Sequence, residues 1–326
     1  GVRDGVQESA SSAQGFLRCC PGTSGLVCEM GGSSMELAEI HGGRVGRRMT
    51  SPLGPLKMRD IRGGKKGRKA HIKDHVAAMH AHLGEQRNRL FLVGGSFRAL
   101  AKIDMERRAY PLKVAHEYRM SAASLRDTMR YIAENDADAL RARAGVSSAR
   151  MALVPLCAEA LKEVVKTFKP RDIAISSYGI REGLLYQQMP QPLRDRDPLI
   201  EACSFVESRD ARTPGAGKAV YKFIEPLFKS APEDRKRIIK AACMLHDVGW
   251  RAHPDYRAED CFDNATRANM GGLKHSERVY LGLALLHRYS NTRDNTRFSE
   301  LKEHVIEKDQ HQAEVVGKAM RFAAML

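Results

Sequence analysis

The first half of the chain alternates between short apolar runs and longer stretches with helical periodicity. Apolar runs bounded by glycine or polar residues predict strands at 26–30, 35–40, 46–50, 90–93 and 173–176. The turn His41-Gly42-Gly43 joins the second and third of these strands as a hairpin. Apolar residues three and four positions apart predict helices over 69–84, 97–106, 120–144 and 148–168, with a kink at Pro155.

The second half of the chain has a different pattern. A stretch rich in proline and charge, 187–198, is typical of a linker. Beyond about residue 199 the periodicity is helical and no strand is evident. The sequence therefore predicts an α/β domain at 1–187 followed by an all-helical domain at 188–326.

Composition narrows the function classes. The 326 residues carry a net charge of +15, which favours polyanionic partners. No apolar run approaches the roughly 20 residues of a membrane span, so we expect no membrane partner. The seven cysteines form no C-x-x-C pair, and adjacent Cys19 and Cys20 suit neither a zinc knuckle nor an ordinary disulfide. Their odd number and loose spacing suggest reduced thiols, and we expect a cytoplasmic protein.

Basic residues gather in one stretch, opposed only by Asp60. They are Arg44, Arg47, Arg48, Lys57, Arg59, Arg62, Lys65, Lys66, Arg68 and Lys69, here called the basic cluster. Two interpretations are equally open: a surface that guides a polyanion, or an ordinary solvated face. The aromatic content of 6% argues weakly against base stacking, so nucleic acid is not the expected partner.

Two glycine-containing turns follow predicted strands. Their residues are Gly31, Gly32, Ser33 and Ser34 in the first turn and Gly94, Gly95 and Ser96 in the second. Glycine lets backbone N–H groups approach phosphate oxygens, and serine adds a hydroxyl donor. Glu29 and Glu36 flank the first turn, where carboxylates could hold a metal or a water for phosphoryl transfer. The alternative is a surface hairpin with ordinary acidic residues.

The helical half contains an adjacent His246-Asp247 pair, the pair that HD metallohydrolases use as metal ligands. Those enzymes also need a histidine well upstream, and this sequence has none between residues 117 and 245. We therefore expect the pair to have a structural role, with hydrogen bonds at a helix end.

Four segments together resemble the exopolyphosphatase / guanosine pentaphosphate phosphohydrolase (Ppx/GppA) family of the actin-like phosphotransferase superfamily. The longest and most specific match is SSYGIREGLL at 176–185, beside the family's S-x-Y-G-(L/I)-R-E-G-L-L. The segment EMGGSSMEL at 29–37 is similar to D-I-G-G-G-S-T-E-L, and VGGSFRAL at 93–100 to the family's second phosphate loop. HDVGWRAHPDYRAE at 246–259 is similar to its HD-like helical domain.

The resemblance implies a fold and a reaction. The fold would be an actin-like (ribonuclease H-like) α/β domain followed by a helical HD-like domain. The reaction would be metal-dependent release of terminal orthophosphate from inorganic polyphosphate, with guanosine pentaphosphate as a second candidate substrate and Mg²⁺ or Mn²⁺ as cofactor. Members of the family often pair through the helical domain, so the resemblance also implies a homodimer.

Residue roles are carried over in the same way. Gly5-Val6-Gln7-Glu8-Ser9 matches the family's G-x-E-E-A, which makes Glu8 the general base. Glu29 and Glu36 would hold the metal or the attacking water, and the two glycine turns would bind the terminal phosphates.

Departures from the family pattern open a second hypothesis. Glu29 stands in place of aspartate, Ser33 in place of glycine and Met35 in place of threonine. A longer carboxylate could shift a metal by about an ångström, which is costly in a tuned site. These substitutions motivate the alternative of a catalytically degenerate polyphosphate- or nucleotide-binding protein. The family's N-terminal lobe and extreme C-terminus have no counterpart in the sequence, so we expect a fragment.

Overall fold

The chain divides into two compact units, which are described separately. The computed structural model describes residues 5–85, 88–291 and 296–326. The first unit comprises Gly1–Arg194 and the second Asp195–Leu326. This division lies later than the boundary predicted after residue 187, a position inside helix α9 (Ile180–Gln188).

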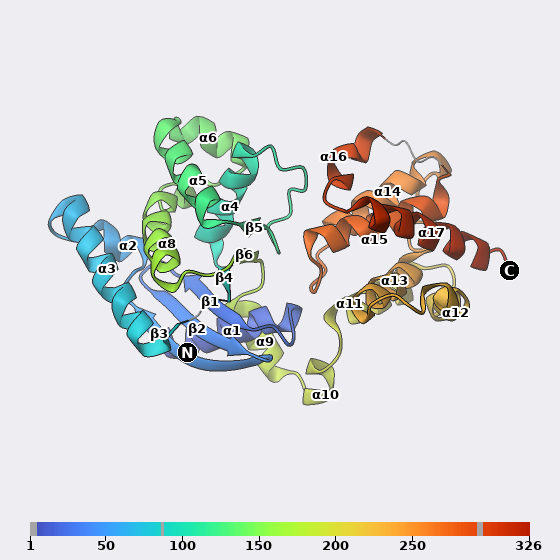
Figure 1. The fold of residues 1–326 in the computed structure, drawn as a ribbon, viewed down its shortest axis with the longest axis horizontal. Helices are drawn as coiled ribbons and strands as arrows, with labels where there is room; N and C mark the ends of the chain where they lie inside the picture. The colour runs from blue at the N-terminus through green and yellow to red at the C-terminus, as the bar shows by residue number, and fades with distance from the viewer. Residues whose placement is uncertain (1–4, 86–87, 292–295) are drawn as a thin grey trace. The chain divides into compact units, whose positions relative to one another are not determined.

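The first unit is built on one six-stranded sheet with the order β3-β2-β1-β4-β6-β5 (Figure 1). β1 is antiparallel to β2 and parallel to β4, which is parallel to β6. The strands are β1 (Gly25–Met30), β2 (Met35–His41), β3 (Arg44–Ser51), β4 (Arg89–Val93), β5 (Arg119–Met120) and β6 (Ile173–Ser176). The five predicted strands and the hairpin are confirmed, whereas the two-residue β5 was not predicted.

Helices cover both faces of this sheet (Figure 1). On one face, α1 packs against the strand residues Val27, Phe91 and Val93. On the opposite face, a larger core joins the sheet to helices that include α3, α4 and α8. Alternate residues of β1 divide accordingly, because successive side chains of a strand point to opposite faces. The helices are α1 (Gly5–Cys19), α2 (Pro55–Arg59), α3 (Gly64–Leu83), α4 (Gly95–Arg107), α5 (Ala122–Glu134), α6 (Ala137–Ala144), α7 (Ser148–Met151), α8 (Val154–Phe168), α9 and α10 (Gln191–Arg194).

Two predicted helices are wrong as single elements. The helix predicted over 120–144 is broken between α5 and α6, where the Asp136 carboxylate accepts a 2.8 Å hydrogen bond from the Ala139 N–H and caps α6. The helix predicted over 148–168 is likewise divided into α7 and α8. Pro155 lies in the first turn of α8 and causes no kink, because that turn needs no N–H from it.

α1 is an element that the pattern did not predict, and it crosses α9 at very short range. A Cβ added to Gly15 would lie 2.0 Å from the Gly179 carbonyl oxygen, and one added to Gly183 would lie 1.7 Å from the Ser11 carbonyl oxygen. Only glycine permits this approach. The crossing places the start of α1 beside the strand ends that carry the predicted site.

The second unit contains only helices among its described residues. They are α11 (Pro198–Asp210), α12 (Ala216–Ile224), η1 (Glu225–Phe228), α13 (Glu233–Leu245), α14 (Pro254–Arg267), α15 (His275–Tyr289), η2 (Thr296–Phe298), α16 (Ser299–Lys302) and α17 (Glu307–Ala323). Their apolar faces form a separate core. The predicted class, an α/β domain followed by an all-helical domain, is confirmed.

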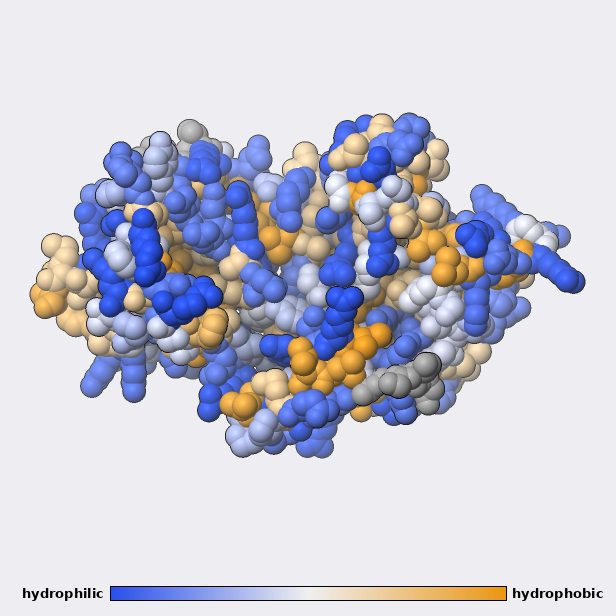
Figure 2. All heavy atoms as spheres, turned by 180° about the vertical axis from the view of Figure 1, so that it is seen from behind, coloured by the Kyte–Doolittle hydropathy of each residue, from blue (hydrophilic) through white to orange (hydrophobic). Residues whose placement is uncertain are grey.

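The surface is largely polar on the face drawn in Figure 2, where hydrophobic residues gather in separate patches. Within the described ranges, no single helix is long and apolar enough to cross a membrane. Only one sharply bent pair, 137–144 with 148–168, reaches that length and apolarity together.

Candidate active site: a carboxylate cluster beside a glycine-lined pocket

Three strands of the first unit end at one pocket. Its volume is about 410 Å³, and it is lined by the residues that follow β1, β4 and β6. Because these strands are parallel, their carboxyl ends meet at the same edge of the sheet, where ligands bind in open α/β sheets. The lining residues are Glu29, Met30, Gly31, Gly32, Val93, Gly94, Gly95, Ser96, Arg98, Arg150, Leu153, Ser177, Gly179, Ile180, Arg181 and Glu182.

The first glycine turn is supported by contacts with the segment that leads into α2. The Gly31 N–H donates to the Ser34 carbonyl (3.0 Å), and the Leu56 N–H donates to the Gly32 carbonyl (2.9 Å). A Cβ on Gly54 would lie 2.1 Å from the Ser33 carbonyl carbon, so the two backbones are in direct contact. The turn is therefore rigid, and Gly31 and Gly32 face the pocket whereas Ser33 and Ser34 do not line it.

The second turn leads directly into a helix. Gly94 has φ 116°, a conformation that favours glycine, and α4 begins at Gly95. α9 begins at Ile180, also at the pocket. The first N–H groups of a helix lack intrahelical partners and carry a partial positive charge. Two helix N-termini at one pocket therefore favour an anion.

Three arginines strengthen this preference. Arg98, Arg150 and Arg181 line the pocket and are exposed, and none forms an ion pair in the part of the chain that the structure describes. The Arg150 guanidinium lies directly over Gly95, since a Cβ there would be 2.4 Å from its Cζ atom. Arginine matches phosphate oxygens with paired N–H groups.

Glu182 of the same motif has a different partner. Its carboxylate accepts a 2.8 Å hydrogen bond from the Gly179 N–H and so caps α9. Neither these arginines nor Glu182 had been predicted as site residues. The signal for Arg181 and Glu182 was present in the R-E-G of the longest motif, whereas Arg150 reaches the pocket only through the packing of α7.

The predicted acidic residues meet on the α1 face of the sheet. Glu29 on β1 lies directly opposite Glu36 on β2 in the antiparallel register, so both side chains are on one face. Glu8 on α1 is close enough that its charge raises the pKa of both carboxyls. The structure thus pairs Glu29 with Glu36 and places Glu8 within electrostatic range of both, although only Glu29 lines the pocket.

Burial makes these carboxylates costly to ionise. Glu36 is 2% exposed, and desolvation raises the pKa of both Glu29 and Glu36 to about 7, with smaller contributions from neighbouring carboxylates. The hydroxyls of Ser12 and Ser34 oppose the shift. Glu29 Oε2 and Glu36 Oε1 are buried and accept no hydrogen bond from the described residues. Two buried oxygens without donors, on carboxylates that face each other across the hairpin, fit a cation such as Mg²⁺ that takes its remaining ligands from water and substrate phosphate.

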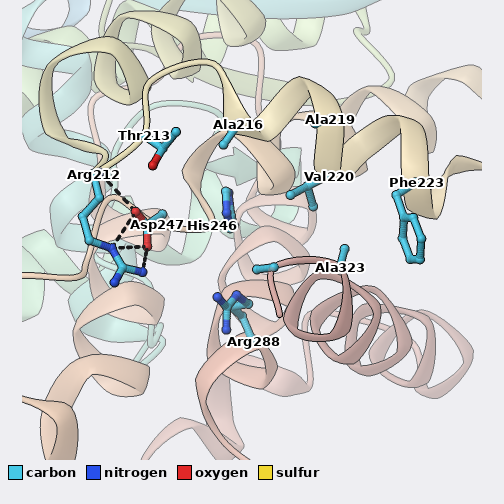
Figure 3. Close-up of a pocket in the computed structure, with 11 residues that line it drawn as sticks. Arg212, Thr213, Ala216, Ala219, Val220, Phe223, His246, Asp247, Arg288 and Ala323 are labelled. Carbon is cyan, nitrogen blue, oxygen red and sulfur yellow. Dashed lines mark hydrogen bonds and ion pairs between the residues drawn. The ribbon is translucent and has the colours of Figure 1, made fainter. Parts of the chain in front are cut away.

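A second pocket, in the helical unit, surrounds the His246-Asp247 pair (Figure 3). It has a volume of about 510 Å³, and its wall combines apolar side chains with polar ones such as Arg212, Thr213 and Arg288. The Asp247 carboxylate accepts hydrogen bonds from the Arg212 Nε (3.0 Å) and backbone N–H (3.1 Å). Burial raises the pKa of Asp247, but the Arg212 hydrogen bonds outweigh it and the pKa is lowered.

His246 is held in a similar way. Its Nδ1 donates to the Cys243 carbonyl (2.7 Å) at the end of α13, and Tyr289 donates to the His246 carbonyl (2.7 Å). Both side chains are therefore hydrogen-bonded at a helix end, as the sequence analysis expected. The candidate active site is therefore the anion-binding pocket of the first unit with its acidic residues, and not the His246-Asp247 pair.

Comparisons with known proteins cover both units. Residues 224–326 match the model of the exopolyphosphatase C-terminal domain, and residues 2–192 match that of the Ppx/GppA phosphatase family. Retrograde regulation protein 2 of Saccharomyces cerevisiae is 28% identical over 155 residues, which are 44% of this chain and 25% of that protein.

Two solved structures are similar in part. The Aquifex aeolicus member of the Ppx/GppA family is 16% identical with a TM-score of 0.47, over 56% of this chain and 62% of that one. An exopolyphosphatase from Cytophaga hutchinsonii is 18% identical with a TM-score of 0.49, over 56% and 63%. The chain thus spans a quarter of the yeast protein and less than two thirds of each solved chain. Because the family model matches residues 2–192, more than half of the sequence, the chain belongs to the Ppx/GppA phosphatase family.

Proposed function

We propose that the chain acts in a phosphoanhydride hydrolase that releases terminal orthophosphate from inorganic polyphosphate. Guanosine pentaphosphate is the second candidate substrate. The observation that carries the proposal is the pocket at the ends of β1, β4 and β6. There, three arginines that have no ion pair with any described residue and two helix N-termini adjoin the buried carboxylates. A phosphate chain needs the positive groups, and its hydrolysis needs the acids.

The substrate's terminal phosphates would be held by Arg98, Arg150 and Arg181 and by backbone N–H groups of the two glycine turns. The Gly31 N–H is excluded from these donors, because it already donates to the Ser34 carbonyl. Gly94 lines the pocket in a backbone conformation, φ 116°, that residues with a side chain rarely adopt. Rigid support of the first turn by the Gly54 backbone keeps these donors in place before substrate binds. Positioning and electrostatic stabilisation of this kind account for most of the rate in phosphoryl transfer.

The acid cluster fits the divalent cation that the family resemblance implies, Mg²⁺ or Mn²⁺. Glu29 and Glu36 would supply carboxylate oxygens, because each has a buried oxygen without a donor. When bound, the cation would neutralise charge on the phosphate oxygens. It would also lower the pKa of both carboxyls, so binding should release protons near neutral pH.

The general base remains a proposal with two candidates. The resemblance assigns Glu8, which is coupled electrically to Glu29 and Glu36 but does not line the pocket. Glu29 does line it, and its pKa of about 7 suits proton transfer at neutral pH. Either carboxylate would take the proton of the attacking water, and the other would hold the water or the cation.

The basic cluster extends over β3, α2 and α3, outside the pocket lining. Arg68 is held by Glu159 through two hydrogen bonds of 2.7 and 3.1 Å, and Arg47 pairs with Glu39 at 3.2 Å. Other members, such as Lys65 and Lys66, are exposed. We propose that they attract the long polyanion, which predicts binding that weakens as salt increases.

The test measures phosphate release from long-chain polyphosphate with Mg²⁺, together with binding of polyphosphate. It uses the 326-residue chain and, in parallel, any longer natural form that contains it. Glu8→Gln and Glu29→Gln should each be compared with Arg150→Ala and with the control Arg126→Ala, an exposed arginine on α5 outside the pocket. Replacing the residue that acts as general base should lower phosphate release about a hundredfold or more.

The outcomes separate the hypotheses. Arg150→Ala should weaken polyphosphate binding about tenfold, with Arg126→Ala unchanged. Absence of release in every form, combined with tight binding that Arg150→Ala weakens, would replace the hydrolase by a degenerate binding protein, the alternative that the substitutions at 29, 33 and 35 motivate. RNA binding that polyphosphate fails to displace would favour a nucleic-acid role for the basic cluster.

A further inference from the structure

The C-terminal end of α1 places two thiols next to a histidine. Cys19 Sγ and Cys20 Sγ are 3.2 Å apart, and a ring nitrogen of His116 lies within 4.8 Å of both. Across the described parts of the chain, no other three ligand atoms of His, Cys, Asp or Glu lie so close together. Cys19 is 0% and His116 4% exposed, so the interior packing of the unit fixes the positions of these two side chains.

A fourth donor lies at the edge of this group. Glu117 Oε1 is 3.9 Å from Cys20 Sγ, and Glu117 is buried. Its backbone is left-handed, with φ 62°, which is uncommon for a residue other than glycine. In an extended strand, neighbouring side chains point to opposite sides, but this conformation lets His116 and Glu117 both reach the thiols. Backbone strain of this kind is concentrated at functional sites.

We propose that Cys19, Cys20 and His116 bind Zn²⁺, with Glu117 as the fourth ligand. The adjacent cysteines lack the spacing of a zinc knuckle, but the fold adds the donors of His116 and Glu117 to them. Two thiolates, an imidazole and a carboxylate form a donor set that zinc accepts in tetrahedral geometry. Bonds of about 2.3 Å to sulfur and 2.0 Å to nitrogen place tetrahedral donors about 3.5 to 3.8 Å apart. The three donors within 4.8 Å of one another therefore need to move by about an ångström at most. Cys20 is partly exposed and provides an entry path.

The cation would stabilise the thiolate charge, which the buried site does not favour without it. Burial raises the pKa of the Cys19 thiol, and this thiol donates to the Phe16 carbonyl at 3.0 Å. A divalent cation deprotonates the thiols it binds and stabilises the resulting thiolates. Zinc binding should therefore release protons and become stronger as the pH rises.

Metal binding at this site should also affect the phosphate pocket, through a hydrogen bond between Ser177 and His116. The Ser177 N–H donates to His116 Nδ1 at 3.4 Å, and Ser177 lines the pocket. If Nδ1 binds the metal, its lone pair is no longer available. If Nε2 binds it, the neutral ring carries its proton on Nδ1 and cannot accept there. In either case the bond from Ser177 is lost, so zinc should alter polyphosphate affinity.

The experiment uses the reduced 326-residue chain, free of metal, titrated with Co²⁺ as a coloured substitute for zinc. We expect a near-ultraviolet sulfur-to-cobalt absorption band that Zn²⁺ abolishes by displacement. Cys20→Ser and His116→Gln should each weaken Zn²⁺ binding at least tenfold. Cys203→Ala, which removes a buried cysteine of the helical unit, should leave the band and the affinity unchanged.

Two results would overturn the proposal. One is the absence of the sulfur band when thiol titration shows all cysteines reduced; the other is a band that both Cys20→Ser and His116→Gln retain. If these variants fail to fold, alkylation of the wild type decides: Zn²⁺ should protect Cys20 from iodoacetamide, and unchanged labelling would refute the site. None of these readouts depends on phosphate release, so the result is independent of the proposed function.

Discussion

Replacing Glu36 by glutamine should stabilise the metal-free chain at high pH and leave it nearly unchanged at low pH. Glu36 is 2% exposed, and burial raises its pKa from the usual 4.5 to about 7. A carboxyl whose pKa is higher in the folded state binds more protons there than in the unfolded state. Its stabilising contribution is complete below the unfolded value and is lost as the pH rises through about 7.

The magnitude follows from the size of this difference. Raising a carboxyl pKa from 4.5 to about 7 corresponds to roughly 3 kcal/mol at high pH, as an upper value because the charges of Glu36 and Glu29 interact. Glutamine keeps the shape and avoids the buried charge. At about pH 8.5 in a chelator, Glu36→Gln should therefore be more stable than wild type by up to about 3 kcal/mol, and at about pH 5 the two should nearly agree.

The assay is urea unfolding at the two pH values, with and without Mg²⁺. Added Mg²⁺ should stabilise the wild type most at high pH and stabilise Glu36→Gln much less, because the variant lacks one carboxylate ligand. Glu39→Gln serves as control, since this residue of the same strand is partly exposed and pairs with Arg47. A variant that is equally destabilised at both pH values would refute the reasoning, because burial of charge would then not be the dominant cost.

Two further predictions concern packing and a buried charge. Gly183→Ala should lower the free energy of unfolding by about 3 kcal/mol, because its Cβ would lie 1.7 Å from the Ser11 carbonyl oxygen; Gly32→Ala, which meets only the flexible Leu56 side chain at 3.2 Å, should cost far less in the same urea titration. Asp104→Asn should cost about 3 kcal/mol at pH 7, because the fully buried carboxylate accepts hydrogen bonds from Thr128, Tyr118, Ser124 and Arg107. Burial raises the pKa of Asp104, but these hydrogen bonds together lower it, so the difference should shrink as unfolding is measured at pH values falling through the folded-state pKa, and a constant difference would contradict this account.

The strands of the first unit were predictable because their signals are local. The runs at 26–30 and 90–93 are apolar, short and bounded by glycine turns, and the structure places β1 and β4 there. The turns that follow them adjoin the pocket for the same reason, since parallel strands bring their ends together. The acid pair was found because Glu29 and Glu36 flank one turn of a hairpin, and antiparallel pairing makes flanking residues neighbours.

The parts that were missed depend on tertiary contacts. α1 buries Ser9, Ser11 and Ser12, small polar residues that give no apolar periodicity but allow the close crossing with α9. Arg150 meets Gly95 only because α7 packs beside the pocket, and no spacing in the sequence encodes that meeting. Pro155 was misread because proline is equally compatible with a kink and with a first helical turn, and the break at 152–153 decides between them.

The antiparallel register of the β1–β2 hairpin has an implication for how the sequence can vary. A slip of one residue would send Glu36 to the opposite face of the sheet, away from Glu29 and Glu8. The tight Gly31–Ser34 end of the hairpin thus tolerates no change in length. The other end of β2, where the 41–43 turn leads into β3, is different. A β-bulge between Ala38 and Ile40 already shifts the pairing of β2 with β3 there. Insertions near the 41–43 turn can be absorbed there, so natural relatives and engineered versions should differ in length at that tip while the acid pair stays aligned.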